Sequence, residues 1–365
     1  MQAAYTKHTL NFSFDARTSR GAMKDKLAYF VKIWDERQPE LFGIGECGPL
    51  PKLSIDDRPD FEVFLQEKVS NLGATPKPNS IEEVADWVQR YIPAEWPSIR
   101  FGFEIAWLDY LQGGRRLIFP GSFTAGKPIP INGLIWMGPL ETMLLQITDK
   151  IDQGFDCIKM KVGGLDFEKE CDILQYIRRK YYQKPIILRL DANGAFKPEE
   201  ALAKLHALSA FDIHSIEQPV KAGQTALMAE LCEKSPIPIA LDEELIGVNE
   251  LKQKAKLLDE IKPPYIILKP SLLGGFAACR EWIQLAETRH IGWWMTSALE
   301  SNIGLNAIAQ FTAQYDNVIP QGLGTGMLYT NNIPSPLKVG QGQIIYQKEL
   351  NFDLDILDFA INGSN

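Results

Sequence analysis

Charged side chains follow five successive apolar, β-rich runs of this 365-residue sequence, each close to the end of its run. From the second lysine onward they are separated by 25 to 30 residues, so the charge recurs at a similar place in each repeat. Residues two apart on a strand point to the same side, and this parity predicts that the charges face inward and their apolar neighbours outward. The charged residues are Lys159 and Lys161, then Asp191, Glu217, Asp242 and Lys269.

Three of these residues are carboxylates with the composition of a metal site. Brought together without a cation, they would repel one another, and at least one would take up a proton. The strand ends carry no Cys or His, which favours a hard ion, Mg²⁺ first and Mn²⁺ second. We therefore predict that Asp191, Glu217 and Asp242 together bind one divalent ion.

The lysines on either side of this metal site suit proton abstraction next to a carboxylate. A lysine with a second lysine and a metal ion nearby should have a depressed pKa, which makes a neutral amine available as a base. The positive charge of the ion would stabilise the resulting enediolate. The sequence thus predicts an enzyme that removes a proton from the carbon beside a carboxylate.

These residues need a scaffold that gathers strand ends. Between residues 128 and 325, short β-rich runs alternate with helical stretches, which indicates repeated βα units. Eight such units predict an α/β fold of the (β/α)8-type barrel, in which the carboxyl ends of the strands converge on the active site. The predicted strands lie within 128–136, 157–162, 185–192, 213–220, 236–245, 265–270, 291–300 and 318–324.

The two ends of the chain have a different pattern. Residues 1–127 contain hairpin-like strands followed by helices, and they predict an α+β capping domain placed before the barrel. Residues 326–365 carry one more strand signal, and we expect this segment to pack back on the capping domain and complete it.

The composition of the chain limits the kinds of molecule that we expect it to bind. The chain has 38 basic and 46 acidic residues, a formal net charge of −8, and no basic run. This argues against nucleic acid and against an anionic membrane surface, and favours a small molecule. The polar N-terminus and the lack of an 18-residue apolar run predict neither a signal peptide nor a membrane span. Five widely spaced cysteines without a C-x-x-C pair predict reduced thiols in a cytoplasmic protein. The oligomeric state stays open.

Seven motifs give the sequence a resemblance to a known family over nearly its whole length. They are KMK, LRLDANGAF, IEQPV, ALDEEL, ILKPSLLGG, TSALESNIGLNAIAQ and GLGTGML. The chain is similar to the enolase superfamily, and within it to the muconate-lactonising subgroup with Lys-x-Lys on the second barrel strand. The resemblance implies that the three carboxylates bind Mg²⁺ and that Lys161 is the base. It also implies that Lys159 tunes Lys161 and that Lys269 stabilises the enediolate by its charge.

The resemblance also implies a substrate. The motifs are most similar to those of enzymes that dehydrate and aromatise 2-succinyl-6-hydroxy-2,4-cyclohexadiene-1-carboxylate in menaquinone biosynthesis. The succinyl arm carries a second carboxylate that needs an anchor, and glycines would let backbone N–H groups approach it closely. Arg20, in the loop 16–21, could contact an anion or could equally be an exposed charge. The candidate substrate contacts are Arg189, Asn193, Ser297, Gly322, Gly324 and Arg20.

Several alternatives stay open. Dipeptide (L-Ala-D/L-Glu) epimerase, N-acylamino acid racemase and muconate cycloisomerase share the catalytic residues. The epimerases carry Asp-x-Asp on the eighth strand for the ammonium group of the dipeptide. This chain has GLGTG at 322–326, where a buried ammonium would lack a partner. From a different class, a non-catalytic, small-molecule-binding barrel should have lost some of the five charged positions, and none is lost.

Overall fold

Long strands dominate the first part of the chain. The computed structural model describes residues 1–18 and 21–359. Three strands form an antiparallel sheet in chain order: β1 (Gln2–Thr18), β2 (Gly21–Asp35) and β3 (Gln38–Cys47). The helices that accompany this sheet are α1 (Phe61–Ser70), α2 (Glu82–Tyr91) and α3 (Pro97–Leu111), with a short 3-10 turn, η1 (Leu72–Ala74), after α1. The α+β cap predicted from the sequence is therefore confirmed.

The sheet of the cap is covered on both faces because successive side chains on a strand point in opposite directions. On β2, Tyr29, Val31 and Ile33 join the cluster that contains the cap helices. Their neighbours Ala28 and Phe30 join a second cluster with side chains from the barrel. One face of the sheet thus holds its own helices and the other packs on the barrel.

The middle of the chain forms a parallel sheet of seven strands, each paired with the next one along the chain. The strands are β5 (Gly133–Ile135), β6 (Cys157–Lys161), β7 (Ile187–Asp191), β8 (Ile213–Glu217), β9 (Ile239–Leu241), β10 (Tyr265–Leu268) and β11 (Gly292–Met295). They are short and almost wholly buried, as parallel strands between a packed interior and an outer layer of helices should be.

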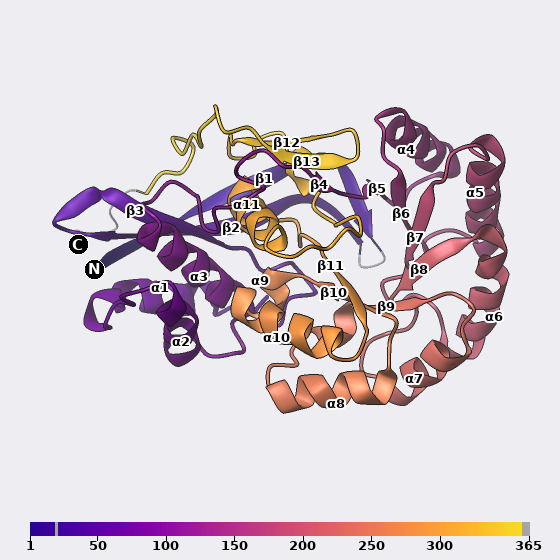
Figure 1. Cartoon of the computed structure of the whole chain (residues 1–365), viewed down its shortest axis with the longest axis horizontal. Helices are drawn as coiled ribbons and strands as arrows, with labels where there is room; N and C mark the ends of the chain where they lie inside the picture. Colours follow the sequence, from indigo (N-terminus) through magenta and orange to yellow (C-terminus); the bar gives the residue numbers. More distant parts are fainter. Residues whose placement is uncertain (19–20, 360–365) are drawn as a thin grey trace.

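Helices connect these strands and form the outer layer of the barrel (Figure 1). The longer ones are α4 (Leu140–Asp152), α5 (Phe167–Lys180), α6 (Pro198–Leu208), α7 (Thr225–Lys234), α8 (Leu251–Ile261), α10 (Phe276–Glu287) and α11 (Asn302–Thr312). The short ones are α9 (Pro270–Leu273) and the 3-10 turns η2 (Ser209–Phe211), η3 (Glu243–Leu245) and η4 (Thr325–Met327). The alternation of strand and helix is the one that the sequence predicts.

The eighth predicted strand, within 318–324, is reduced to two bridging residues. Gln321 pairs with Ile131 just before β5, and Gly322 pairs with Thr296 just after β11, both in parallel. These bridges close the ring between its first and last strands. Proline and glycine beside this short segment are poor strand formers, which explains why it pairs at only two positions.

The C-terminal segment makes two separate sets of contacts. Tyr329 bridges Phe12 of β1, so residues 328–331 run along the cap. Beyond them, β12 (Leu337–Gly340) and β13 (Gln343–Tyr346) form an antiparallel hairpin that pairs with β4 (Ile129–Pro130). The segment therefore touches the cap and the first barrel strand, and the division at residues 127 and 325 stays a prediction.

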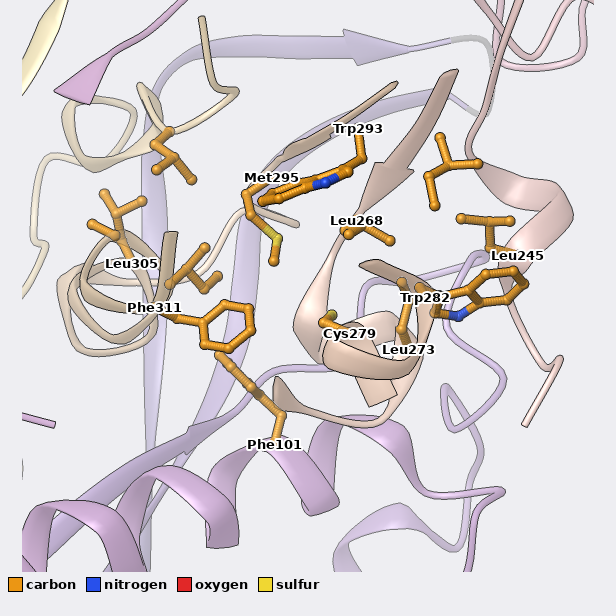
Figure 2. Close-up of a cluster of buried hydrophobic side chains, with 14 of the residues drawn as sticks. Phe101, Leu245, Leu268, Leu273, Cys279, Trp282, Trp293, Met295, Leu305 and Phe311 are labelled. Atoms are coloured by element: carbon orange, nitrogen blue, oxygen red, sulfur yellow. The ribbon is translucent and has the colours of Figure 1, made fainter. Parts of the chain in front are cut away.

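Cap and barrel share a continuous hydrophobic core. Figure 2 shows Phe101 projecting from α3 into a cluster that contains Leu268 of β10, Met295 of β11 and Phe311 of α11. The ring of Phe276, at the start of α10, lies 5.4 Å from that of Phe101 and 4.7 Å from that of Phe311. Aromatic packing across the boundary holds the cap in a fixed position above the barrel.

All five cysteines are unpaired, as the sequence predicts. Burial raises the pKa of the Cys157 thiol to about 11, which keeps it protonated at neutral pH.

Among the helices of residues 1–18 and 21–359, none is long and apolar enough to cross a bilayer.

Candidate active site

The carboxyl ends of β6, β7 and β8 place charged side chains in one layer. Backbone pairing aligns Lys161 with Asp191, and Asp191 with Glu217. Paired residues on neighbouring parallel strands point the same way, so all three side chains face the barrel interior. Asp242 and Lys269 directly follow β9 and β10 and reach the same region. The structure therefore brings together the five strand ends that the sequence singled out.

Ammonium groups separate and neutralise the carboxylates. Lys159 Nζ lies 3.0 Å from Asp191 Oδ2 and donates a hydrogen bond to Glu217 Oε2. Lys161 Nζ lies 3.0 Å from the same oxygen of Asp191. Lys269 Nζ donates to Asp242 Oδ2. Three buried lysines and three buried carboxylates thus form one charge-balanced network, which is the condition under which such groups can be buried.

The three lysines differ in how strongly they hold their protons. Burial lowers the pKa of Lys161, and the charges of Lys159 and Lys269 add to this effect against the pull of Asp191. For Lys159, burial is outweighed by the carboxylates of Asp191 and Glu217, and its pKa is raised. The pKa of Lys269 is also raised, because Asp242, Glu243 and Glu217 together outweigh burial. Lys161 is therefore the lysine of the network that loses its proton most readily.

The carboxylate oxygens of this network are suitable ligands for a divalent metal ion, but their side chains do not converge on one point. In the described part of the chain, no three His, Cys, Asp or Glu side chains are arranged to hold a metal ion. Even so, Glu217 Oε1 is buried without a hydrogen-bond partner. Burial raises the pKa of Glu217, opposed by Lys159 and reinforced by Asp191 and Asp242. A divalent cation would supply the missing partner, provided that the ammonium groups shift to admit it.

The network forms one wall of a cavity of about 610 Å³ between the barrel and the cap. This volume is typical of sites for small molecules. Lys159, Lys161, Asp191 and Lys269 line it directly, together with Asn193, which accepts a hydrogen bond from Lys161 Nζ at 2.7 Å. Asn193 also donates to Glu243 at 3.1 Å, so it is held on both sides and fixes the position of Lys161.

Other parts of the chain supply the rest of the cavity lining. Three of the candidate substrate contacts, Ser297, Gly322 and Gly324, lie on one wall of it. The cap contributes Phe14 and Asp15 from β1, among others. The predicted contact Arg20 lies outside the described residues.

Arg189 does not line the cavity. It pairs with Lys159 and Ser215, one layer deeper than Asp191, and is fully buried. Its Nη1 donates to the carbonyl of Pro320 at 2.7 Å, and its guanidinium stacks 4.1 Å from the ring of Trp294. Strand parity predicts its inward direction correctly but says nothing of depth, which differs by two residues along the strand.

Sequence reasoning missed several cavity residues. Asn132, Trp136 and Thr325 all line the cavity. Asn132 is the polar residue inside the apolar run of the first predicted strand, and that contrast could have marked it. Trp136 and Thr325 had no such signal, because an aromatic residue at a strand end and a threonine in a glycine-rich turn are both common.

A buried carboxylate lies behind this wall at Glu300, which the sequence analysis did not single out. Its position in the motif TSALES, after the seventh barrel strand, is where polar groups meet the site.

The capped barrel and the charged side chains at its strand ends define a class of protein. Comparison with known proteins confirms this class. Residues 142–349 match the family described as "Enolase C-terminal domain-like". This chain belongs to the enolase superfamily.

One relative and two solved structures refine the assignment. An o-succinylbenzoate synthase from Desulfotalea psychrophila is 44% identical over 94% of this chain and 98% of its own length. The crystal structure of MenC from the same organism is 42% identical, with a TM-score of 0.82 over 94% of this chain and 99% of that one. The L-Ala-D/L-Glu epimerase from Bacillus subtilis also has a TM-score of 0.82, over 95% of this chain and 96% of that one, but at 19% identity. The fold is therefore common to both activities and does not by itself decide between them.

Proposed function

We propose that this protein is an o-succinylbenzoate synthase, which dehydrates 2-succinyl-6-hydroxy-2,4-cyclohexadiene-1-carboxylate in menaquinone biosynthesis in the cytoplasm. The proposal rests on one observation: Lys161 and Lys269 line the same cavity, and the pKa of Lys161 is lowered by burial. The identity of 44% to a synthase over nearly the whole chain supports the choice of substrate.

The site residues have distinct roles in this reaction. Neutral Lys161 takes the proton from the ring carbon beside the carboxylate, and the C–H electrons pass into that carboxylate as an enediolate. When the electrons return, the ring C–O bond breaks. The departing hydroxide takes the proton back from Lys161 and leaves as water, and the ring becomes aromatic. The ammonium groups of Lys159 and Lys269 stabilise the negative charge in between.

Asp191, Glu217 and Asp242 are the residues that would hold a metal ion, Mg²⁺ in the first place. The unpartnered, buried Oε1 of Glu217 and the all-oxygen donor set support this assignment. When bound, the ion supplies positive charge that stabilises the enediolate.

A second candidate, dipeptide epimerisation, is favoured by the presence of both Lys161 and Lys269 on the cavity lining. The turn at 322–326 offers no carboxylate to an ammonium group of a ligand. The two lysines would then act as bases on opposite faces of the α-carbon. The main proposal needs no ammonium partner and agrees with the sequence identity, so it takes precedence.

One assay separates the two candidates. Purified protein with Mg²⁺ is incubated with the cyclohexadiene carboxylate, and o-succinylbenzoate is followed by its absorbance. In parallel, L-Ala-L-Glu is incubated in D₂O and the α-proton exchange is followed by NMR. We expect aromatisation of the first substrate and its loss in Lys161→Ala by at least about a thousandfold. Exchange of the dipeptide without turnover of the diene would overturn the proposal.

A further inference from the structure

Glu300 is a carboxylate fully buried behind the cavity wall, yet no catalytic step uses it. Its Oε1 accepts the hydroxyl of Ser271 at 2.5 Å. Its Oε2 accepts the hydroxyl of Ser297 and, at 2.7 Å, the backbone N–H of Ala298. Three donors therefore satisfy the carboxylate, and one of them, Ser297, lines the cavity.

These contacts fix the direction of the hydrogen bonds at the wall. A carboxylate only accepts, so Ser297 must donate its single hydroxyl proton to Glu300. The oxygen of Ser297 then accepts the hydroxyl of Thr325 at 2.8 Å and the backbone N–H of Glu300 at 3.3 Å. A serine hydroxyl offers one donor and two acceptor sites. Ser297 is thus saturated and has no proton left for a ligand.

The backbone of the turn at 322–326 supplies further donors on this wall. The N–H of Gly322 is occupied, because it donates to the carbonyl of Met295 at 2.7 Å. Those of Gly324 and Thr325 have no acceptor within residues 1–18 and 21–359. Both residues line the cavity. The chain from Thr325 through Ser297 to Glu300 ties this turn to the end of β11.

We propose that Glu300 is a positioning residue for the far end of the substrate. Through Ser297 and Thr325 it holds the turn at 322–326 so that backbone N–H groups, and not the hydroxyl of Ser297, bind the second carboxylate of the substrate. This inference rests on the proposed function, because it assumes a substrate with two carboxylates.

Glu46 provides a matched control. It is also a fully buried carboxylate at the boundary between cap and barrel. It accepts the hydroxyl of Ser301 at 2.6 Å and the backbone N–H groups of Ser301 and Gly304 at 2.9 and 3.0 Å. Neither Ser301 nor Gly304 lines the cavity. Glu46→Gln therefore repeats the chemistry of Glu300→Gln without reaching the ligand.

The test compares two ligands in the presence of Mg²⁺. Dissociation constants of o-succinylbenzoate and of benzoate, which lacks the succinyl arm, are measured by calorimetry for the wild type, Glu300→Gln and Glu46→Gln. KM and kcat are measured for the same proteins. Glu300→Gln removes the negative charge to which Ser297 donates, and a hydrogen bond to a neutral amide is weaker than one to a carboxylate, so the hold on Ser297 and Thr325 is loosened. We expect the preference for o-succinylbenzoate over benzoate to fall about tenfold in Glu300→Gln, since a hydrogen bond to a charged group is worth about that much. KM should rise more than kcat falls.

Glu46→Gln should lower the melting temperature but keep the preference. An unchanged preference in folded Glu300→Gln, or an equal loss in both variants, would refute the role of Glu300. If Glu300→Gln does not fold, Thr325→Val and Thr325→Ser test the proposal instead. Thr325→Val removes the hydroxyl that donates to Ser297 at nearly constant volume, and Thr325→Ser keeps a hydroxyl there. Equal preferences in these two variants would likewise refute the proposal. A wild type that neither turns over the diene nor prefers o-succinylbenzoate would instead show that the proposed function is wrong.

Discussion

Glu104 of α3 and Phe276 of α10 meet at 2.6 Å, where the carboxylate Oε2 accepts the backbone N–H that opens the barrel helix. Oε1 accepts the next N–H, that of Ala277, at 3.1 Å. The residue before the helix is Gly275, with φ +97°, and a Cβ there would lie 2.1 Å from Oε2. A side chain of the cap therefore satisfies the free N–H groups at the start of a barrel helix, which a local residue normally does.

Replacing Glu104 with Gln should destabilise the protein by about 1 to 3 kcal/mol, because the amide keeps one acceptor oxygen and turns an N–H group toward one of the two backbone donors. Urea unfolding at pH 8 measures the change. Burial raises the pKa of Glu104 to about 7, so the wild-type carboxylate is mostly ionised at that pH. The exposed Glu233→Gln is the control and should change stability by less than about 0.5 kcal/mol. Equal effects of the two substitutions would contradict the capping role.

His214 should make the fold sensitive to acid. Its ring stacks on Tyr265 with centroids 5.3 Å apart, and burial, with a contribution from Arg189, lowers its pKa from 6.5 to about 4. Between pH 6.5 and 4, His214 therefore binds a proton in the unfolded chain but not in the folded chain. The contribution of His214 to stability is present above pH 6.5 and is lost as the pH falls through this window.

Denaturant unfolding at several pH values between 7 and 4 tests this sign. The free energy of unfolding of the wild type should decline toward pH 4, and that of His214→Gln should decline less steeply. The difference between the two proteins at pH 7 serves as the reference, because His214 is mostly neutral there in both states. Parallel curves would show that another group carries the acid sensitivity.

The sequence predicts the barrel and its charged layer well because both depend on local periodicity. Alternation of strands and helices sets the fold, and parity places Lys161, Asp191 and Glu217 on one side of their strands. It does not set depth, and the predicted substrate contact Arg189 lies one layer below the cavity. Nor could it predict Glu300 or Glu104, whose partners depend on how separate segments pack.

The eighth strand illustrates the same limit. Its residues are too few and too rich in proline and glycine for periodicity to define it, and its two bridges depend on neighbours that come from opposite ends of the barrel. The hydrogen-bond state of Ser297 is likewise a property of its surroundings. From the sequence it is a candidate anion contact, and only the position of Glu300 shows that its proton is already committed.

Magnesium should stabilise the folded protein apart from any effect on activity. A ligand that binds only the folded state at a hundred times its dissociation constant adds about 2.7 kcal/mol. We therefore expect Mg²⁺ to raise the melting temperature of the wild type and EDTA to reverse the rise. In Glu217→Gln the rise should be much smaller, because one of the three carboxylates is lost. NaCl at equal ionic strength controls for screening, and an equal rise with NaCl, or in Glu217→Gln, would argue against the assigned ligands.

The two glycines of the turn at 322–326 should respond differently to a methyl group. A Cβ on Gly322 would lie 2.5 Å from Thr296 Oγ1 and 2.8 Å from Thr296 Cγ2, at the bridge that closes the barrel. A Cβ on Gly324 would meet its nearest neighbours, the carbonyl oxygen of Asn132 and Ile131 Cδ1, at 3.6 Å, an ordinary contact. Overpacking at Gly322 should therefore cost about 1 to 3 kcal/mol, whereas Gly324→Ala should stay within about 0.5 kcal/mol of the wild type.

Thermal unfolding of the two single variants measures this contrast, and a double variant identifies its cause. If the side chain of Thr296 is the obstacle, Gly322→Ala combined with Thr296→Ala should recover much of the stability that Gly322→Ala loses, since the two sites are in direct contact and their effects are not additive. The single variant Thr296→Ala completes this double-mutant cycle. Additive losses would mean that the glycine is needed for its backbone, and equal losses at Gly322 and Gly324 would mean that the turn tolerates no side chain at either position.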